Sequence, residues 1–537
     1  MKYMEELIKM SFLNVSFFLF LILGTIIYYL VPGTIQWFIL LVLSLIYYCS
    51  FSFKCAYALV YITTIIFIAG LLLTKLDKNC KIACKREVDG VKLSREEKKV
   101  IKARYTRKRK VVVAIACVLG FGLLALIKYT GFAVSNLNAV FGLSVKAPSF
   151  LVPIGLSFFT FQGISYVIDV YQGKCKACTN YLKMLLFVGF FPQIMQGPIG
   201  RYNHFVDGGL FSEHKWDLRR AQFGAQRIGW GLFKKLVLAD RAGVVVTVVT
   251  NTSTIYGGYI NVLTLLMYSI ELYMDFSGGI DIVIGAAEIF GVTMDENFRQ
   301  PYFSKSIGEF WRRWHISLGA WMKDYIFYPF SLTKGMNNLG KWGRKHFGKH
   351  FGTVIPICLA NLLIFFIVGI WHGAEWRYVI YGIYNGVIIA VSAAFKPYFK
   401  KWLKFLHING ESRGWHIVQI IRTFILVNIG WICDISASGM RWGINFTLGL
   451  FKNYHLSQLS LSNLSDLGLA GYDYAILLFG CLIIFAVSML KERGVNIRES
   501  IAFKPIALRW VIYYGFFVMI LILGYIGTTS GFMYANF

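Results

Sequence analysis

The sequence predicts an all-α polytopic membrane protein, and three observations point to this fold class. The chain has 537 residues, 57% of them hydrophobic and only 15% charged, whereas a soluble domain carries about 25% charged residues. Apolar segments long enough to cross a bilayer recur from end to end. Only short polar stretches separate them. We therefore expect one membrane domain over residues 1–537, although its length would suit about three or four soluble domains.

The apolar runs follow one another along the whole chain. The first, from Ser11 to Leu30, is too long for the core of a signal peptide and lacks a small-residue cleavage pattern, so we expect a membrane span. The run at 259–292 is long enough to break in two. At about 20 residues per span, we expect roughly eleven to thirteen membrane elements. They lie at 11–30, 35–51, 56–73, 111–127, 150–170, 181–196, 232–249, 259–292, 354–371, 378–395, 418–433, 475–490 and 511–526.

A basic stretch at 75–110 interrupts these runs, with 15 Lys or Arg against 5 Asp or Glu. The positive-inside rule places such a stretch in the cytoplasm, so we expect a cytoplasmic loop. Three spans precede it, which puts the N-terminus outside. An orientation signal is the ordinary role of such a loop. Binding of anionic lipid headgroups or of a phosphate-bearing donor stays open.

Neither the net charge nor the cysteines indicate a nucleic-acid or metal site. The charge is +28, but in so apolar a chain the excess Lys and Arg must lie in loops or at membrane interfaces. The pairs Cys80–Cys84 and Cys175–Cys178 are each half of a zinc site at most, because neither has a second ligand pair nearby. We expect no metal and no nucleic-acid partner.

Chemistry-bearing residues gather at 271–376, where the stretch at 310–325 is too charged to span lipid. We predict an interfacial or re-entrant helix, with tryptophans at headgroup level and Arg312 free to reach phosphates. His315 would face whatever this helix covers, although an interfacial histidine with satisfied hydrogen bonds fits the same place. The apolar positions recur at the spacing of one helical face: Trp311, Trp314, Leu318, Trp321 and Tyr325.

A second histidine ends the next apolar run. His372 directly follows the uncharged run at 354–371, and Asn361 lies close to three turns earlier, so both polar side chains share one face of an apolar helix. A titratable group at the end of a membrane helix is a candidate functional residue. A capping or headgroup-contacting histidine is the simpler alternative.

Four carboxylates interrupt the apolar run at 259–292. Carboxylates in such a run must pair with cations, take up protons or border water. We expect them to pair with the arginines near position 312. They are Glu271, Asp275, Asp281 and Glu288.

Long motifs mark this region and others: YMDFSGGID at 273–281, ENF at 296–298, PY at 301–302, SIGEFWRRWHISL at 306–318 and WHG at 371–373. Further motifs lie at 153–162, 191–202 and in the aromatic C-terminus at 531–537. Together they resemble the membrane-bound O-acyltransferase (MBOAT) family, in particular its bacterial alginate O-acetyltransferase type. The resemblance covers nearly the whole chain.

The resemblance implies a ring of tilted transmembrane helices, with re-entrant or interfacial helices, around a central funnel. His372 matches the family's essential histidine and His315 its second active-site position. A neutral imidazole can take a hydroxyl proton at neutral pH. We therefore predict that His372 is the general base toward the acceptor hydroxyl and that His315 positions the thioester or stabilises charge. Trp311, Arg312 and Trp314 are candidates for the donor path.

The function implied is that of an enzyme, an O-acyltransferase. It would move an acetyl or other acyl group from a cytoplasmic thioester across the membrane for O-acetylation of an extracytoplasmic polysaccharide. Acetyl-CoA is the expected co-substrate, with no cofactor bound permanently. The expected partners are the lipid bilayer, an extracytoplasmic acetyltransferase protein and a cell-surface polysaccharide. The expected location is the bacterial cytoplasmic membrane.

Two alternatives differ from this function. One is D-alanyl transfer to teichoic acid from a carrier-protein thioester, within the same family. The other is a proton-coupled transporter or flippase, in which Asp275, Asp281 and the two histidines would relay protons. The sequence shows no inverted repeat of the kind that many transporters contain.

Overall fold

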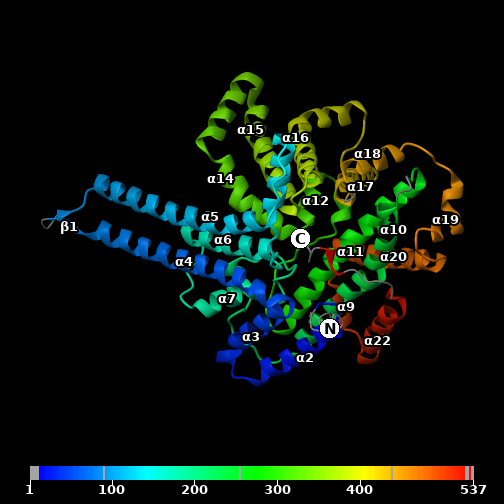
Figure 1. The fold of residues 1–537 in the computed structure, drawn as a ribbon, viewed down its shortest axis with the longest axis horizontal. Helices are drawn as coiled ribbons and strands as arrows, with labels where there is room; N and C mark the ends of the chain where they lie inside the picture. Colours follow the sequence, from blue (N-terminus) through cyan, green and yellow to red (C-terminus); the bar gives the residue numbers. More distant parts are fainter. Residues whose placement is uncertain (1–10, 89–90, 253–255, 437–438, 526–530, 534–537) are drawn as a thin grey trace. The chain divides into compact units, whose positions relative to one another are not determined.

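The structure is a computed structural model that describes residues 11–88, 91–252, 256–436, 439–525 and 531–533. Helices dominate these ranges (Figure 1). Eight of the helices described there are long and apolar enough to cross a membrane, and the helix at Val15–Leu30 is shorter. The predicted fold class, an all-α polytopic membrane protein, is confirmed. The ring of helices around a central funnel and the single domain over 1–537 stay predictions.

The chain folds into two compact units. Unit 1 comprises Met1–Gly224 and Ala286–Asp295, and unit 2 comprises Ala225–Gly285 and Glu296–Phe537. The elements of unit 1 are α2 (Val15–Leu30), α3 (Gly33–Ser52), the 3₁₀ helix η1 (Phe53–Cys55), α4 (Ala56–Lys85), β1 (Glu87–Val88), β2 (Val91–Lys92), α5 (Arg95–Phe141), α6 (Leu156–Gln172), α7 (Tyr181–Gly189), α8 (Tyr202–Asp207) and the start of α9 (Leu218–Leu232).

Unit 2 is larger and contains the predicted site region. Its elements are the π-helix η2 (Phe233–Ala239), α10 (Asp240–Asn251), most of α11 (Tyr259–Ile289), η3 (Pro301–Phe303), α12 (Ile307–Arg313), α13 (Ile316–Met322), the π-helix η4 (Lys323–Phe327), α14 (Tyr328–Ser331), α15 (Lys334–His372), α16 (Trp376–Phe405), α17 (Arg413–Ile435), α18 (Met440–Gly449), η5 (Leu456–Leu459), α19 (Leu461–Ser465), α20 (Gly471–Glu492), α21 (Ile497–Ala502) and α22 (Ile506–Leu523).

The basic stretch at 75–110 is a helical hairpin rather than an open loop. Figure 1 shows α4 and α5 running side by side, joined by the antiparallel pair β1 and β2. The side chain of Ser94 accepts the N–H of Glu97, and the carboxylate of Glu97 accepts the N–H of Ser94, so a capping box begins α5 inside the basic stretch. At 47 residues, α5 is about 70 Å long, well beyond the ~30 Å apolar core of a bilayer.

The motif at 153–162 forms the buried core of unit 1. Helix α6 is buried along nearly its whole length. The Gln162 amide donates to the carbonyl of Phe187 (2.6 Å) and accepts from the Gln193 amide (2.9 Å). Because a buried amide costs free energy unless its hydrogen bonds are satisfied, this pair fixes how the motif at 191–202 packs on α6.

The run at 259–292, which is long enough to break in two, forms one continuous helix, α11, over Tyr259–Ile289. A glycine within it serves close packing. A Cβ on Gly278 would lie 2.9 Å from the carbonyl oxygen of Gly231, closer than side chains are found. The glycine therefore lets the backbone of α11 approach the end of α9.

The stretch at 310–325 is not the single helix that its apolar spacing predicts. Helix α12 ends at Arg313 and α13 begins at Ile316, because His315 adopts a left-handed conformation with φ of 47°. The N–H of Ile316 donates to the carbonyl of Asn297 (3.0 Å) instead of to the preceding turn. The spacing of the apolar residues continues across the break, so this spacing gave no sign of it.

Helices α15 and α16 form a tight hairpin that follows the predicted run at 354–371. Gly369 on α15 lies against Gly382 on α16, and a Cβ on Gly382 would clash with the carbonyl oxygen of Phe365. Backbones can approach this closely in membrane helices only where side chains are small. The hairpin brings His372, the last residue of α15, against the first turns of α16.

We predict that Gly382→Val destabilises this hairpin. The added side chain meets backbone atoms that cannot move aside, and overpacking of this kind costs about 1–3 kcal/mol. The measurement is the midpoint of thermal unfolding of the purified protein in detergent. Gly131→Val on α5 is the matched control, because a Cβ on Gly131 meets no atom within 4 Å. Equal midpoints for the two variants would contradict the packing role.

Candidate active site

The side-chain amide of Asn297 contacts His315, and the contacts of this amide with Ser317 determine which way it is oriented. The Asn297 Oδ1 atom accepts the N–H of Ser317 (3.0 Å) and the Ser317 hydroxyl (2.9 Å), and it lies 3.3 Å from His315 Nδ1. A backbone N–H needs an acceptor, so this Asn297 atom is the oxygen, and His315 Nδ1 must donate to it. The lone pair of the neutral imidazole is therefore on Nε2.

Burial keeps His315 uncharged. The residue is 1% exposed and lies between α12 and α13, outside the eight candidate spans. Burial and, as the smaller cause, the opposition of nearby His372 to a second positive charge together lower the pKa of His315 to about 3. A neutral ring with its lone pair on Nε2 can accept a hydrogen bond. This geometry favours positioning over charge stabilisation among the predicted roles.

Aromatic rings surround His315 and connect it to His372. The Phe276 ring of α11 meets the His315 ring edge-on at 4.9 Å between centroids, and the Trp371 ring lies at 5.7 Å. Trp371 also lies 5.0 Å from its neighbour His372. The structure therefore brings the two predicted histidines to one place, beside the same indole.

His372 is nearly buried and faces α16. It is 7% exposed, and its ring stacks on Tyr378 at 6.2 Å and meets Tyr381 edge-on at 5.8 Å. Gly373 allows this arrangement, because a Cβ there would clash with the Tyr378 ring. Asn361, predicted to share its helical face, is half-buried in α15.

The three donor-path candidates have different surroundings. Trp314 is buried, with its ring 5.0 Å from Phe298 and 5.7 Å from Trp431. The Trp311 indole N–H donates to Asn385 Oδ1 (3.0 Å), whereas Arg312 is exposed. Of the three, Arg312 therefore has the geometry to meet a phosphate, and the donor path stays a prediction.

Two asparagines at the site were not predicted from the sequence. Asn297 orients His315, and Asn385 connects α16 to α12 through the indole of Trp311. Asn385 also donates to the carbonyl of Tyr381 (2.9 Å). The sequence feature that could have identified Asn385 is its position in the apolar run at 378–395, where a polar side chain needs a partner.

Two of the four predicted carboxylates of α11 pair with cations other than those expected. The Lys235 ammonium contacts Asp275 (2.7 Å) and the Lys234 ammonium contacts Asp281 (2.6 Å). Arg227 also reaches Asp281 at 3.0 Å. For Asp275 and Asp281, pairing with the arginines near 312 is therefore wrong. In the described part of the chain, Arg313 instead pairs with Glu309 and Glu492.

The C-terminal motif begins beside one of these ion pairs. The N–H of Met533 donates to Asp275 Oδ2 (3.0 Å), and the Lys235 ammonium lies 5.0 Å from the centre of the Phe532 ring. Residues 534–537, the rest of the motif at 531–537, lie outside the described residues. Within the described ranges, no group of three His, Cys, Asp or Glu side chains is placed to hold a metal ion.

Comparison with known proteins identifies relatives of the chain. The family model "MBOAT, membrane-bound O-acyltransferase family" matches residues 177–433. A Pseudomonas syringae protein named "Probable alginate O-acetylase AlgI" is 32% identical over 401 residues, which are 72% of this chain and 70% of that protein.

Two further relatives carry other names. A peptidoglycan O-acetyltransferase of Helicobacter pylori is 28% identical over 60% of this chain and 62% of its own length. A teichoic acid D-alanyltransferase of Bacillus subtilis is 31% identical over 52% of this chain and 67% of its own length.

We predict that His315→Asn is milder than His315→Leu for acyl transfer. Asn keeps a donor and an acceptor. We therefore expect the rate of acyl transfer to fall about tenfold or less, which corresponds to the free energy of one hydrogen bond. Leu removes both groups and should cost about 10²-fold through misplacement. The measurement is the rate of acyl loss from a labelled thioester in proteoliposomes.

His455→Leu is the control for this comparison, because His455 is exposed and lies at the start of η5. It should keep the wild-type rate. Equal and complete loss in both His315 variants would argue for proton transfer by His315 instead of hydrogen bonding.

Proposed function

The chain belongs to the membrane-bound O-acyltransferase family, and we propose that it moves an acetyl group from acetyl-CoA in the cytoplasm to the outer side of the membrane. The acceptor in this proposal is an extracytoplasmic polysaccharide. The observation that carries the proposal is the meeting of His315 and His372, both buried, beside Trp371 in unit 2.

Several predictions from the sequence are confirmed. The family is the one that the motifs resembled, and the predicted enzyme class, an O-acyltransferase, agrees with the family and with the names of the relatives. The protein is a multi-pass membrane protein. The acyl donor, the direction of transfer, the cytoplasmic membrane and the outer N-terminus are part of the proposal.

In the proposed reaction, His372 takes the proton of the acceptor hydroxyl. The hydroxyl oxygen then bonds to the thioester carbonyl carbon, and the carbon–sulfur bond breaks as the thiolate leaves with the proton that His372 returns. His315 positions a reactant through the lone pair on Nε2.

The names of the relatives support a glycan acceptor and leave a second candidate. Two of them are named for O-acetylation of alginate and peptidoglycan, which favours O-acetylation of a polysaccharide here. We propose an extracytoplasmic acetyltransferase protein as a further partner. The third is named for D-alanyl transfer to teichoic acid, and this likeness keeps D-alanyl transfer as the alternative.

The test uses purified protein in liposomes with acetyl-CoA labelled in the acetyl group and a soluble polysaccharide as the acyl acceptor. We predict that wild-type protein consumes the thioester and that His372→Ala slows this consumption by about 10²–10⁴-fold, the usual loss when a general base is removed. His346→Ala is the matched control, since His346 is an exposed histidine in α15, before the kink at Gly348. It should keep the wild-type rate.

Other outcomes would contradict the proposal. Wild-type turnover by a folded, inserted His372→Ala variant would exclude His372 as the base. A thioester that stays intact with wild-type protein would favour transport. Consumption of a D-alanyl carrier-protein thioester, with acetyl-CoA untouched, would select the alternative acyl group.

The direction of transfer can be tested through the hairpin of α4 and α5. Three helices, α2, α3 and α4, precede its basic tip. Because the tip has an excess of Lys and Arg, we propose that it lies in the cytoplasm. We predict that Lys99→Cys, in a chain whose ten cysteines are replaced by serine, resists an impermeant maleimide in intact cells.

The same variant should react after lysis, because Lys99 is exposed on α5. The cysteine-free chain without this substitution measures background labelling. Labelling of Lys99→Cys in intact cells would reverse the orientation of the membrane domain and with it the outward direction of acyl transfer.

A further inference from the structure

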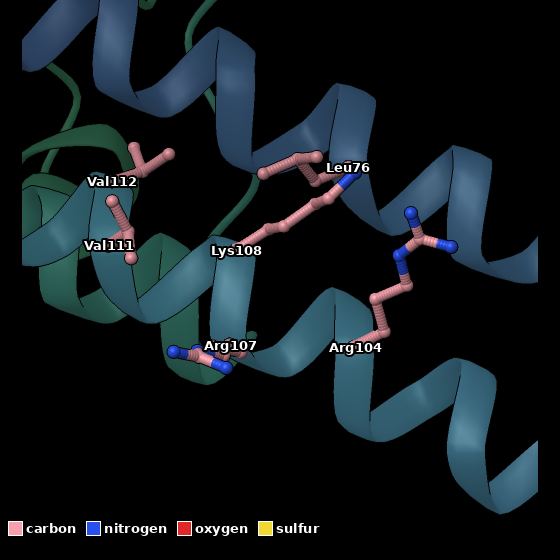
Figure 2. Close-up of a pocket in the computed structure, with 6 residues that line it drawn as sticks. All are labelled: Leu76, Arg104, Arg107, Lys108, Val111 and Val112. Carbon is pink, nitrogen blue, oxygen red and sulfur yellow. The ribbon is translucent and has the colours of Figure 1, made fainter.

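A groove lies between the two helices of the basic hairpin. It has a volume of about 360 Å³, and its lining combines three apolar and three basic side chains, shown in Figure 2. We call this feature the basic groove. Its lining residues are Leu76 on α4 and Arg104, Arg107, Lys108, Val111 and Val112 on α5.

The groove lies where both helices change from apolar to basic. On α5 the basic residues end at Lys110 and the apolar run begins at Val111; on α4 the apolar run ends just before Lys75. The carboxylate of Asp77 on α4 lies 3.8 Å from the guanidinium of Arg109 on α5, so the two transitions stand at the same level. This level is where a helix leaves the apolar core of a bilayer.

The basic side chains of the groove carry charge that the protein does not neutralise. Among the described residues, none of Arg104, Arg107 and Lys108 has a carboxylate within 4.0 Å, and all three are exposed. The nearby carboxylate, Asp77, is already occupied by Lys81 (2.8 Å) and Arg109. The groove therefore has three cations available for an anion.

The apolar side of the groove continues along the membrane-facing surface of α5. Val111 is followed on the same helical face by Ile115 and Val118, which are four and seven residues further on and are also exposed. Leu76 completes the floor from α4. An apolar chain starting in the groove could therefore run down α5 without leaving apolar surface.

We propose that the basic groove binds an anionic phospholipid. Arg104, Arg107 and Lys108 contact the headgroup phosphate, and the upper part of an acyl chain lies on Leu76, Val111 and Val112. The shape favours lipid over a free phosphate or a nucleotide, because those ligands would leave the apolar floor without a partner. Basic residues at the cytoplasmic interface attract anionic lipids through the same electrostatics. The proposal does not depend on the proposed acyl transfer.

The test is a titration of the full-length protein in detergent with dioleoyl phosphatidylglycerol, followed by native mass spectrometry. The groove variant Arg104→Gln/Arg107→Gln/Lys108→Gln should weaken the tightest binding at least about tenfold, since each basic side chain near an anionic lipid contributes about fivefold in affinity. The matched control is Lys98→Gln/Lys99→Gln/Lys102→Gln, which removes the same charge from the same helix but outside the groove.

Two further measurements test the two parts of the site. Leu76→Gln should weaken phosphatidylglycerol binding, and dioleoyl phosphatidylcholine should bind the wild type and the groove variant with similar, low affinity. Free coenzyme A should not displace phosphatidylglycerol. Circular dichroism and size-exclusion chromatography confirm that each variant is folded.

Three results would overturn the proposal. If the control variant and the groove variant lose the same affinity for phosphatidylglycerol, the overall charge of the protein attracts the lipid and the groove does not. If the groove variant binds phosphatidylglycerol as the wild type does, the groove is not the site. If coenzyme A competes at concentrations similar to the lipid, the cations serve a soluble phosphate ligand instead.

Discussion

The ion pairs between α11 and η2 are the constraint on which the candidate site depends. Asp275 and Asp281 lie in an apolar run, where an uncompensated charge would be very costly, and Lys235 and Lys234 neutralise them at 2.7 and 2.6 Å. Lys235 also contacts Asp240 at 2.7 Å. These pairs fix the register of α11 against η2. Phe276 directly follows Asp275, so the same register places its ring against His315.

The conformation of His315 shows how the fold compensates for local strain. A non-glycine residue in the left-handed region costs about 1–2 kcal/mol, and it persists only where surrounding contacts determine it. Here Asn297 supplies those contacts, through its side chain to Ser317 and His315 and through its carbonyl to Ile316. The break in the helix places the imidazole beside Trp371 instead of leaving it along a helix surface. Strain at this position is therefore an argument for a functional role.

Sequence patterns predicted the apolar elements and both histidines but not the contacts between distant segments. The run at 354–371 and His372 were visible because hydropathy and charge are local properties. Lys234 and Lys235 were not identified as partners of α11, because they lie in a run that hydropathy classes as apolar. The break at His315 was hidden, since apolar spacing continues across it. The stretch at 75–110 was expected as a loop because of its charge, although the Ser94 capping box could have indicated a helix start.

The ion pairs also weigh against the transporter alternative. A proton relay through Asp275 and Asp281 requires carboxylates that gain and lose protons during a cycle. Protonating Asp281 would leave Lys234 as a buried cation without its partner, and breaking such a pair costs about 3–5 kcal/mol. Protonating Asp275 would leave Lys235 with Asp240 as its remaining carboxylate. The carboxylates are therefore committed to holding α11 in place. His315 and His372 form no part of these ion pairs and lie beside Trp371, so the proposed acyl transfer does not require the pairs to break.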